Sequence, residues 1–267
     1  MNTQDYSKTW RSSVAMAAHV YTSLGLVAGF YAINAILLGD HRGAFLAMFV
    51  AVVIDATDGT LARAVDVKRY TPWINGRKLD DIVDYFNYTL VPVFYVWQQS
   101  WLPEPAWLWC AFPLLGSVFA FVHEGAKEEE RGFFRGFPSY WNVVAFYLAI
   151  FVRPESGWMV LPILVFLGIL CVVPVRFVYP NRPPCWKAFF LGGAIAWGTL
   201  LLAMLWRFPT VPPTWSLLSL AYPVAYVFAS FYLDRLVPNF EQAATIATDS
   251  TDVWPEGCEP LGESSEG

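Results

Sequence analysis

The sequence is dominated by apolar stretches long enough to cross a lipid bilayer. An α-helix rises 1.5 Å per residue, so about 20 apolar residues span the hydrocarbon core. Such stretches occur at residues 20–38, 43–61, 82–98, 106–122, 139–152, 159–178, 188–206 and 216–236. We therefore expect an all-α polytopic membrane protein with about eight transmembrane helices.

The composition excludes an ordinary soluble domain of this length. Of the 267 residues, 56% are hydrophobic and only 15% are charged, and the mean hydropathy is +0.42. Soluble domains carry about 25% charged residues because their surface faces water. The formal charge of −5 is concentrated in an acidic C-terminal stretch, so it does not indicate a basic partner, and no nucleic acid is expected.

The distribution of Lys and Arg predicts the orientation. With eight helices, Arg42, Arg153 and Arg207 fall on one side of the membrane, and all other Lys and Arg residues fall on the opposite side. Cytoplasmic loops carry the excess of basic residues. We expect both termini in the cytoplasm, with a cytoplasmic segment at 1–19, a transmembrane domain at 20–238 and a disordered acidic tail at 239–267.

Four acids lie at helical spacing at the same membrane edge. Asp55 and Asp58 are in the second stretch, and Asp80 and Asp84 begin the third. Carboxylates next to hydrocarbon are costly unless they bind a cation or face a polar cavity. Carboxylates one helical turn apart can share a hard divalent ion such as Mg²⁺ or Mn²⁺. The acids therefore predict a metal site between two helices.

Two other interpretations of these acids remain open. They could be polar helix ends that pair with Arg63, Arg77 and Lys78. They could also belong to a cation-coupled transporter, although transporter sites usually lie near the middle of the membrane between related halves.

The acids are part of a longer pattern, D-x2-D-G-x2-A-R followed by G-x3-D-x3-D, over residues 55–84. This pattern resembles the signature of the CDP-alcohol phosphotransferase family, integral membrane enzymes that transfer a phosphoalcohol or phosphatidyl group from a CDP-linked donor to an alcohol. One departure is the link at 64–75, which is longer than the family usually has. The resemblance implies a six-helix core, here extended by two helices, and makes 20–238 the catalytic domain.

The resemblance also implies roles for individual residues. Asp55, Asp58, Asp80 and Asp84 would hold two Mn²⁺ or Mg²⁺ ions, and Asp84 would also be the general base. The nucleotide would lie against Gly59, Ala62, Arg63 and Gly76.

Two further segments, 137–142 and 174–180, resemble the branch of the family whose acceptor is free choline. That branch implies transfer of the phosphatidyl group of CDP-diacylglycerol to choline, giving phosphatidylcholine and CMP, at the cytoplasmic face of a bacterial inner membrane. Serine, inositol and glycerol phosphate remain alternative acceptors. The oligomeric state is open, with a homodimer among the alternatives.

Aromatic rings bind a trimethylammonium group because they attract cations without needing a hydrogen bond. The candidates beside the acids are Tyr85, Tyr88, Tyr140 and Trp141, although Tyr and Trp also serve simply as interfacial anchors. Arg176, near the cytoplasmic end of the sixth stretch, is a candidate ligand for a lipid phosphate.

Overall fold

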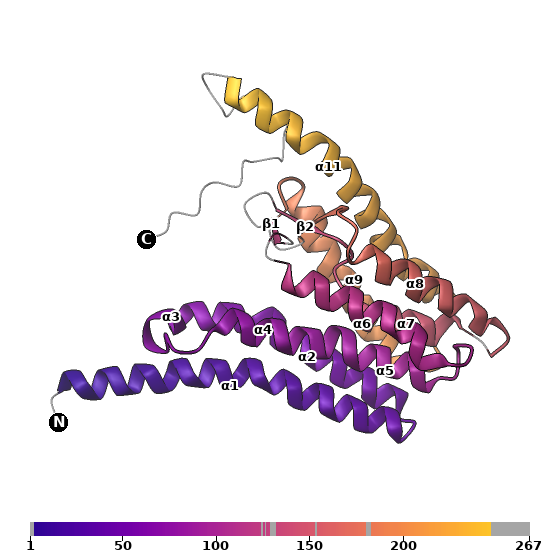
Figure 1. The fold of residues 1–267 in the computed structure, drawn as a ribbon, viewed down its shortest axis with the longest axis horizontal. Helices are drawn as coiled ribbons and strands as arrows, with labels where there is room; N and C mark the ends of the chain where they lie inside the picture. Colours follow the sequence, from indigo (N-terminus) through magenta and orange to yellow (C-terminus); the bar gives the residue numbers. More distant parts are fainter. Residues whose placement is uncertain are drawn as a thin grey trace. The chain divides into compact units, whose positions relative to one another are not determined.

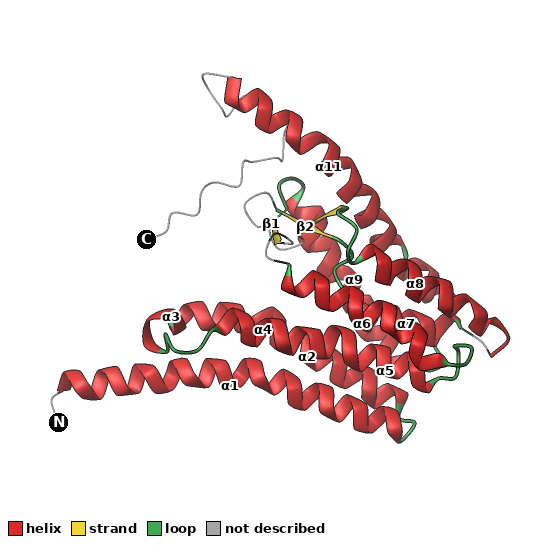
Figure 2. Ribbon diagram, viewed as in Figure 1, coloured by secondary structure: helices red, strands yellow, loops and turns green. Residues whose placement is uncertain are grey.

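The computed structural model describes residues 3–123, 125, 127–128, 132–152, 154–179 and 183–246. Within these residues the chain is predominantly helical (Figures 1 and 2). It divides into two compact units. Unit 1 lies within Met1–Ser117 and Ser139–Val165, and unit 2 within Val118–Pro138 and Phe166–Gly267.

Unit 1 begins with two long helices. Helix α1 (Thr3–Leu37) packs along α2 (His41–Ala64). Asp40 caps α2 by accepting a hydrogen bond from the Gly43 N–H at 2.8 Å. The later elements are α3 (Val67–Tyr70), α4 (Gly76–Asp84), the π-helix η1 (Tyr85–Leu90), α5 (Val91–Gln98), α6 (Ala106–Val122), α7 (Trp141–Phe151), the 3-10 helix η3 (Pro154–Met159) and α8 (Val160–Leu170). The last residues of α6, from Val118, and of α8, from Phe166, belong to unit 2.

Small residues let α1 approach α4 and η1 closely. A Cβ atom added at Gly25 would lie 2.7 Å from Cγ1 of Val83, and one added at Gly29 would collide with the Asn87 side chain. Gly25 and Gly29 form a G-x3-G pattern, which is typical of membrane helices that pack with their backbones close together. This contact holds the helix that carries Asp80 and Asp84 against α1.

An aromatic cluster joins three further helices of unit 1. Phe45 of α2 packs on Tyr95 of α5, with ring centroids 4.7 Å apart, and edge-on against Phe146 of α7 at 5.2 Å. All three side chains are buried. The cluster holds α2, α5 and α7 together. On α2 it lies ten residues before Asp55.

Among its described residues, unit 2 contains a small antiparallel sheet followed by a π-helix and three α-helices. The sheet has the order β1 (Lys127–Glu128), β2 (Phe133–Arg135) and β3 (Arg176–Val178) (Figure 2). The helical elements are η4 (Ala188–Gly192), α9 (Gly193–Arg207), α10 (Pro213–Ser219) and α11 (Ala221–Ile246). Its core is formed by Phe133, Val178, Cys185, Phe190 and Leu233.

Helices occupy all eight apolar stretches, but they differ in length. Among the described residues, four helical segments are long and apolar enough to cross a membrane, and three apolar helices are shorter. The four are Lys8–Leu37, His41–Ala64, Ala188–Arg207 and Pro213–Leu236. The third stretch is helical throughout, yet η1 divides it into α4, η1 and α5. A membrane protein with a mainly helical fold is thus confirmed at this coarser level.

Three expectations need correction. The all-α prediction missed the sheet, because strands of two or three residues leave no periodic signal in the sequence. The sixth stretch was expected to be helical to 178, but α8 ends at Leu170 and β3 follows Pro174, which removes a helix donor. Helix α11 continues to Ile246, into the segment expected to be a disordered tail, and residues 247–267 lie outside the described residues.

Candidate active site

Three of the four predicted acids meet between α2 and α4. Asp55 projects from α2, and Asp80 and Asp84 project from successive turns of α4. One carboxylate oxygen from each lies within 4.8 Å of the others, and all three side chains are partly buried. Acids that are distant in sequence therefore face one another in the structure, and their role as metal ligands stays a prediction.

Asp58 has a different environment. It is 7% exposed, less than the three clustered acids. The Thr22 hydroxyl of α1 lies near its carboxylate, and Asp55 is close enough to repel it electrostatically. Among the residues that the structure describes, Asp58 does not belong to the group of three. Its role as a metal ligand stays a prediction.

Tyr88 forms a hydrogen bond with one acid of the cluster. Its hydroxyl donates a hydrogen bond of 2.7 Å to Oδ2 of Asp55, and Asp84 and Tyr140 are close enough to act on it electrostatically. Tyr88 lies in the π-helix η1. An inserted π-turn changes the direction of the side chains that follow it and is frequent at functional sites. The sequence predicted an aromatic contact for choline here, and the structure adds a contact with a candidate metal ligand.

The predicted nucleotide positions lie around the ends of α2 and α4. Gly59, Ala62 and Arg63 are in the last turns of α2, and Arg63 donates a hydrogen bond to Thr60 at 3.1 Å. Gly76 is the first residue of α4. A Cβ atom at Gly76 would lie 3.3 Å from Cε1 of the buried His19, a tight contact that His19 would have to relieve by a small shift.

The long link at 64–75 is ordered by contacts with α1. It contains α3, and His19 of α1 forms a 2.9 Å hydrogen bond with the buried Thr71. Ser12 donates to the Tyr70 carbonyl at 3.1 Å, and Arg11 donates to the Tyr70 hydroxyl at 2.8 Å. The additional residues therefore form a docked turn that fixes the start of α4.

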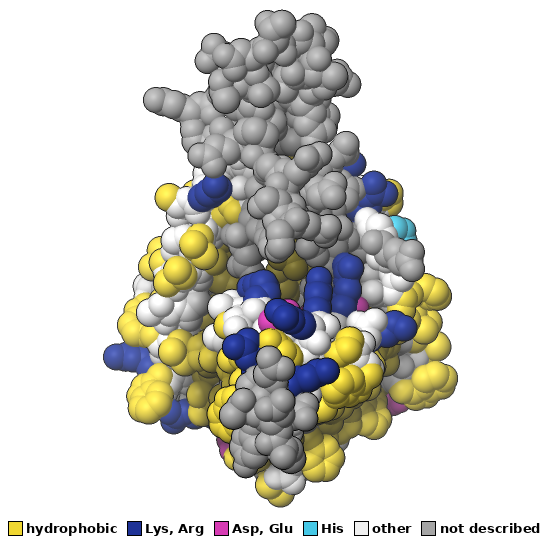
Figure 3. All heavy atoms as spheres, turned by 90° about the vertical axis from the view of Figure 1, so that its left-hand side faces the viewer, with side chains coloured by type: hydrophobic (Ala, Val, Ile, Leu, Met, Phe, Trp, Pro, Cys, Tyr) yellow, Lys and Arg dark blue, Asp and Glu magenta, His cyan; other side chains and the backbone are white. Residues whose placement is uncertain are grey.

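Lys and Arg side chains gather on the face that carries α3 and the N-terminal part of α1 (Figure 3). Those exposed there are Lys8, Arg11, Arg63, Lys68, Arg69, Arg77 and Lys78. Phosphate-bearing molecules are attracted to such a surface before they reach a specific site.

The four predicted choline-binding aromatics are used in different ways. Trp141 is buried and its indole N–H donates to Ser117 at 2.8 Å. The Tyr85 hydroxyl donates to the Leu114 carbonyl at 3.0 Å. Tyr140 precedes α7 and remains 37% exposed. Trp141 and Tyr85 thus anchor helix packing, whereas Tyr88 contacts Asp55 and Tyr140 lies near Tyr88.

Arg176, the candidate for a lipid phosphate, is in β3 of unit 2. Its Nη1 atom lies 3.4 Å from Oδ1 of Asp234 in α11. Both side chains are about one-third exposed or less, at 27% and 33%. The interaction with lipid phosphate stays a prediction, and the structure adds a carboxylate partner that the sequence did not indicate.

The donor set at the cluster suits a hard divalent ion. Three carboxylates can each supply an oxygen, and no thiolate or imidazole belongs to the group of three acids. Mg²⁺ and Mn²⁺ prefer such oxygen ligands and keep positions open for phosphate oxygens. The geometry is therefore compatible with metal-assisted transfer of a phosphate-linked group.

The site and the helical fold agree with comparison to known proteins. The model of the CDP-alcohol phosphatidyltransferase family matches residues 15–170, which include every predicted metal and nucleotide residue. The chain belongs to this family and is a phosphatidyltransferase enzyme, as its signature predicted.

Several curated relatives extend the similarity beyond the family region. A phosphatidylcholine synthase of Legionella pneumophila is 33% identical over 82% of this chain and 88% of its own length. Another, from Legionella bozemanae, is 35% identical over 76% of this chain and 96% of its own. A third, from Mesorhizobium japonicum, is 33% identical over 73% of both chains.

Proposed function

We propose that this enzyme transfers the phosphatidyl group of CDP-diacylglycerol to free choline, giving phosphatidylcholine and CMP. The observation that carries the proposal is the meeting of Asp55, Asp80 and Asp84 within the family region. The similarity to several phosphatidylcholine synthases supports choline as the acceptor.

The acids would hold one or two divalent ions, Mg²⁺ or Mn²⁺. Asp55, Asp80 and Asp84 supply the clustered oxygens, and we propose Asp58 as a further ligand one helical turn from Asp55. Bound ions would neutralise the diphosphate of the donor and the phosphate of the departing CMP. Tyr88 fixes the orientation of Asp55 through its hydrogen bond, as partners of metal ligands commonly do.

Asp84 is the proposed general base. The choline hydroxyl oxygen forms a bond to the phosphorus that carries diacylglycerol, while the bond from that phosphorus to the CMP oxygen breaks. The hydroxyl proton passes to the Asp84 carboxylate, and CMP leaves with the bonding electron pair. A carboxylate is a much weaker base than an alkoxide, so the proton transfer accompanies the attack rather than preceding it.

The substrates would approach from the two helix ends around this cluster. The nucleotide would contact Gly59, Ala62, Arg63 and Gly76. The glycines and the alanine leave the backbone accessible to it, and Arg63 adds positive charge. Tyr88 and Tyr140 would present aromatic faces to the trimethylammonium group. Tyr85 and Trp141 would support this surface indirectly through their contacts with α6.

The proposed location is the bacterial inner membrane, with the chain crossing it eight times. Both termini and the acids would face the cytoplasm, where choline and CDP-linked lipids are available. The support is the asymmetric distribution of Lys and Arg in the sequence. A homodimer is compatible with this arrangement, and the mass of the purified protein in detergent would show whether one forms.

An acceptor assay tests the function directly. Purified protein in detergent micelles would receive CDP-diacylglycerol, Mn²⁺ or Mg²⁺, and choline, serine, inositol or glycerol 3-phosphate in separate reactions. We expect CMP and phosphatidylcholine to form only with choline. Product formation with another acceptor and not with choline would overturn the acceptor assignment, and no CMP release with any acceptor would overturn the proposed reaction.

A further inference from the structure

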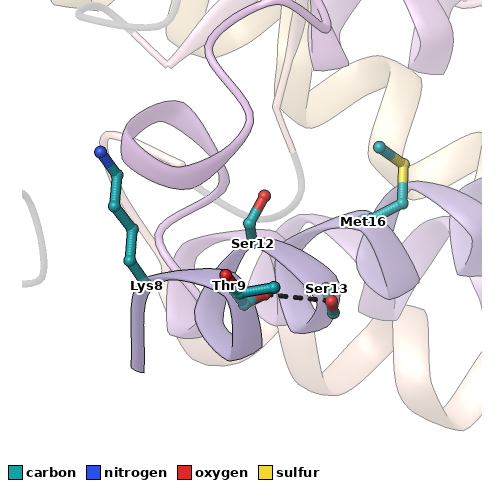
Figure 4. Close-up of a pocket in the computed structure, with 5 residues that line it drawn as sticks. All are labelled: Lys8, Thr9, Ser12, Ser13 and Met16. Carbon is teal, nitrogen blue, oxygen red and sulfur yellow. Dashed lines mark hydrogen bonds between the residues drawn. The ribbon is translucent and has the colours of Figure 1, made fainter. Parts of the chain in front are cut away.

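A hollow on α1 lies outside the acidic site. It is shallow and largely open to solvent, with a volume of about 530 Å³, and its described lining residues are Lys8, Thr9, Ser12, Ser13 and Met16. Figure 4 shows the side chains of Lys8, Ser12 and Met16 extending from the same side of the helix. The lining therefore changes along the helix axis from a cation, through hydroxyl groups, to an apolar thioether.

The same face of α1 continues as an exposed apolar stripe. Residues spaced by three or four positions share one face of a helix. Beyond Met16 this face carries Val20, Leu24 and Val27, which are 54%, 45% and 64% exposed. The stripe belongs to a helix long and apolar enough to cross a membrane. A lipid whose headgroup enters the hollow could thus lay its acyl chains along this stripe.

The charge around the hollow favours an anion. Arg11 lies in the same helix turn as Ser12, and Arg69 precedes Tyr70, whose carbonyl accepts a hydrogen bond from Ser12. The guanidinium carbons of Arg11 and Arg69 lie 5.6 Å and 5.5 Å from the ring centroid of Tyr70. Within the described residues, the contacts of both groups are with this tyrosine. Lys8, which lines the hollow, is also exposed, so its positive charge adds to that of Arg11 and Arg69.

The hydroxyl groups add selectivity. Ser13 donates its proton to the Thr9 carbonyl at 3.0 Å, shown as the dashed line in Figure 4, and Ser12 donates to the Tyr70 carbonyl at 3.1 Å. Each hydroxyl oxygen keeps lone pairs with which it can accept a hydrogen bond. A headgroup with its own hydroxyl donors therefore complements them.

We propose that this hollow binds an anionic phospholipid with a hydroxyl-bearing headgroup, of which phosphatidylglycerol is the example for testing. The phosphate pairs with Lys8, the headgroup hydroxyls donate to Ser12 and Ser13, and the acyl chains follow the stripe from Met16. The lipid is a bound partner of the enzyme and not its substrate.

Binding of a fluorescent phosphatidylglycerol to the purified full-length protein in detergent micelles tests the proposal. We expect Lys8→Gln to weaken binding about fivefold, the effect of one cation at a membrane surface. Lys68→Gln is the matched control, because it removes the same charge from the same face without lining the hollow, and it should change binding less than about twofold. Lys8 is exposed, so its substitution should leave the melting temperature unchanged.

Other probes distinguish the ligand and the site. Phosphatidylcholine should bind more weakly than phosphatidylglycerol, phosphatidic acid should fall between them, and free glycerol phosphate should not compete because it lacks acyl chains. Asp84→Asn should bind phosphatidylglycerol normally even where it cannot turn over substrate. Equal losses in the Lys8 and Lys68 variants, equal binding of both lipids, competition by glycerol phosphate, or loss of binding in Asp84→Asn would each overturn the proposal.

Discussion

The acids of this site have identical side chains but different surroundings. Asp80 and Asp84 share one face of α4 and meet Asp55 across a short gap. Asp81 follows Asp80 directly, and one residue along a helix turns the side chain by about 100°. Neighbouring acids in one helix therefore provide a matched comparison between a residue in the cluster and one outside it.

We predict that Asp84→Asn lowers kcat more than about 100-fold, because a positioned general base contributes a factor of this size or more. Asp81→Asn should change kcat only a few-fold. The measurement is CMP release at saturating substrates. Melting temperature with and without Mn²⁺ provides a second readout: the ion should stabilise the wild type and the Asp81 variant more than the Asp84 variant. Similar kinetics for both variants would contradict the assignment of the base.

The phenol group of Tyr88 gives a second prediction. Tyr88→Phe keeps the ring but removes the 2.7 Å hydrogen bond to Asp55. Loss of such a partner typically weakens metal binding 10- to 100-fold, so the Mn²⁺ concentration for half-maximal activity should rise by about that factor. Choline KM should change much less, because the aromatic face is kept.

Tyr222→Phe is the control for that experiment, since it removes a tyrosine hydrogen bond to the Phe190 carbonyl in unit 2. Its metal dependence should match the wild type. An unchanged metal dependence in Tyr88→Phe would show that the hydrogen bond does not position the ligand.

At the scale of elements, the contact of α1 with α4 and η1 determines where two of the acids lie. Gly25 and Gly29 let the helix backbones approach, and the docked link with α3 fixes the start of α4. Neither the glycine contact nor the docked link touches the acids. Both position α4 relative to α2, and a shift of this helix would separate Asp80 and Asp84 from Asp55.

We predict that Gly25→Ala destabilises the protein by about 1–3 kcal/mol, because the new methyl group would overlap Val83 and force α4 outward. The measurement is thermal unfolding in detergent. Gly198→Ala in α9 is the control, because nothing lies within 4 Å of a Cβ atom at that position. It should be neutral or slightly stabilising, since alanine favours the helix more than glycine does. An equal effect of both substitutions would refute the close-packing argument.

For the whole molecule, the asymmetric distribution of basic residues determines the expected orientation in the membrane. The face with α3 and the N-terminal part of α1 collects many Lys and Arg side chains (Figure 3). Basic segments stay on the cytoplasmic side during insertion. The proposed location of the acids follows from their position next to this basic face.

Cysteine labelling tests the orientation. Lys78→Cys at the start of α4 and Arg207→Cys at the end of α9 are both exposed positions. We expect a membrane-impermeant maleimide to label Arg207→Cys in cells with a permeable outer membrane, and Lys78→Cys only after the inner membrane is opened. The unsubstituted chain gives the background from its native cysteines. Labelling of Lys78→Cys in intact spheroplasts would contradict the orientation.

The sequence determined the class of protein and the chemistry of its site. Apolar length predicted a helical membrane protein, and the spacing of Asp55, Asp58, Asp80 and Asp84 predicted an acidic site on two helices. Both are local properties, because length and a repeat of three or four residues depend only on neighbours in the chain. The family membership indicated by the same pattern is confirmed.

The tertiary structure decided which of the candidate residues meet. It placed Tyr88 on Asp55 through a π-helix, buried Trp141 against Ser117, and kept Asp58 outside the group of three acids. The helix in the sixth apolar stretch, α8, also ends earlier than expected, and three short strands form the small sheet. These outcomes depend on side chains far apart in sequence and on backbone bonds that leave no periodic pattern. The sequence could therefore predict which acids belong to the candidate site. Only the packing between helices determined which side chains contact them.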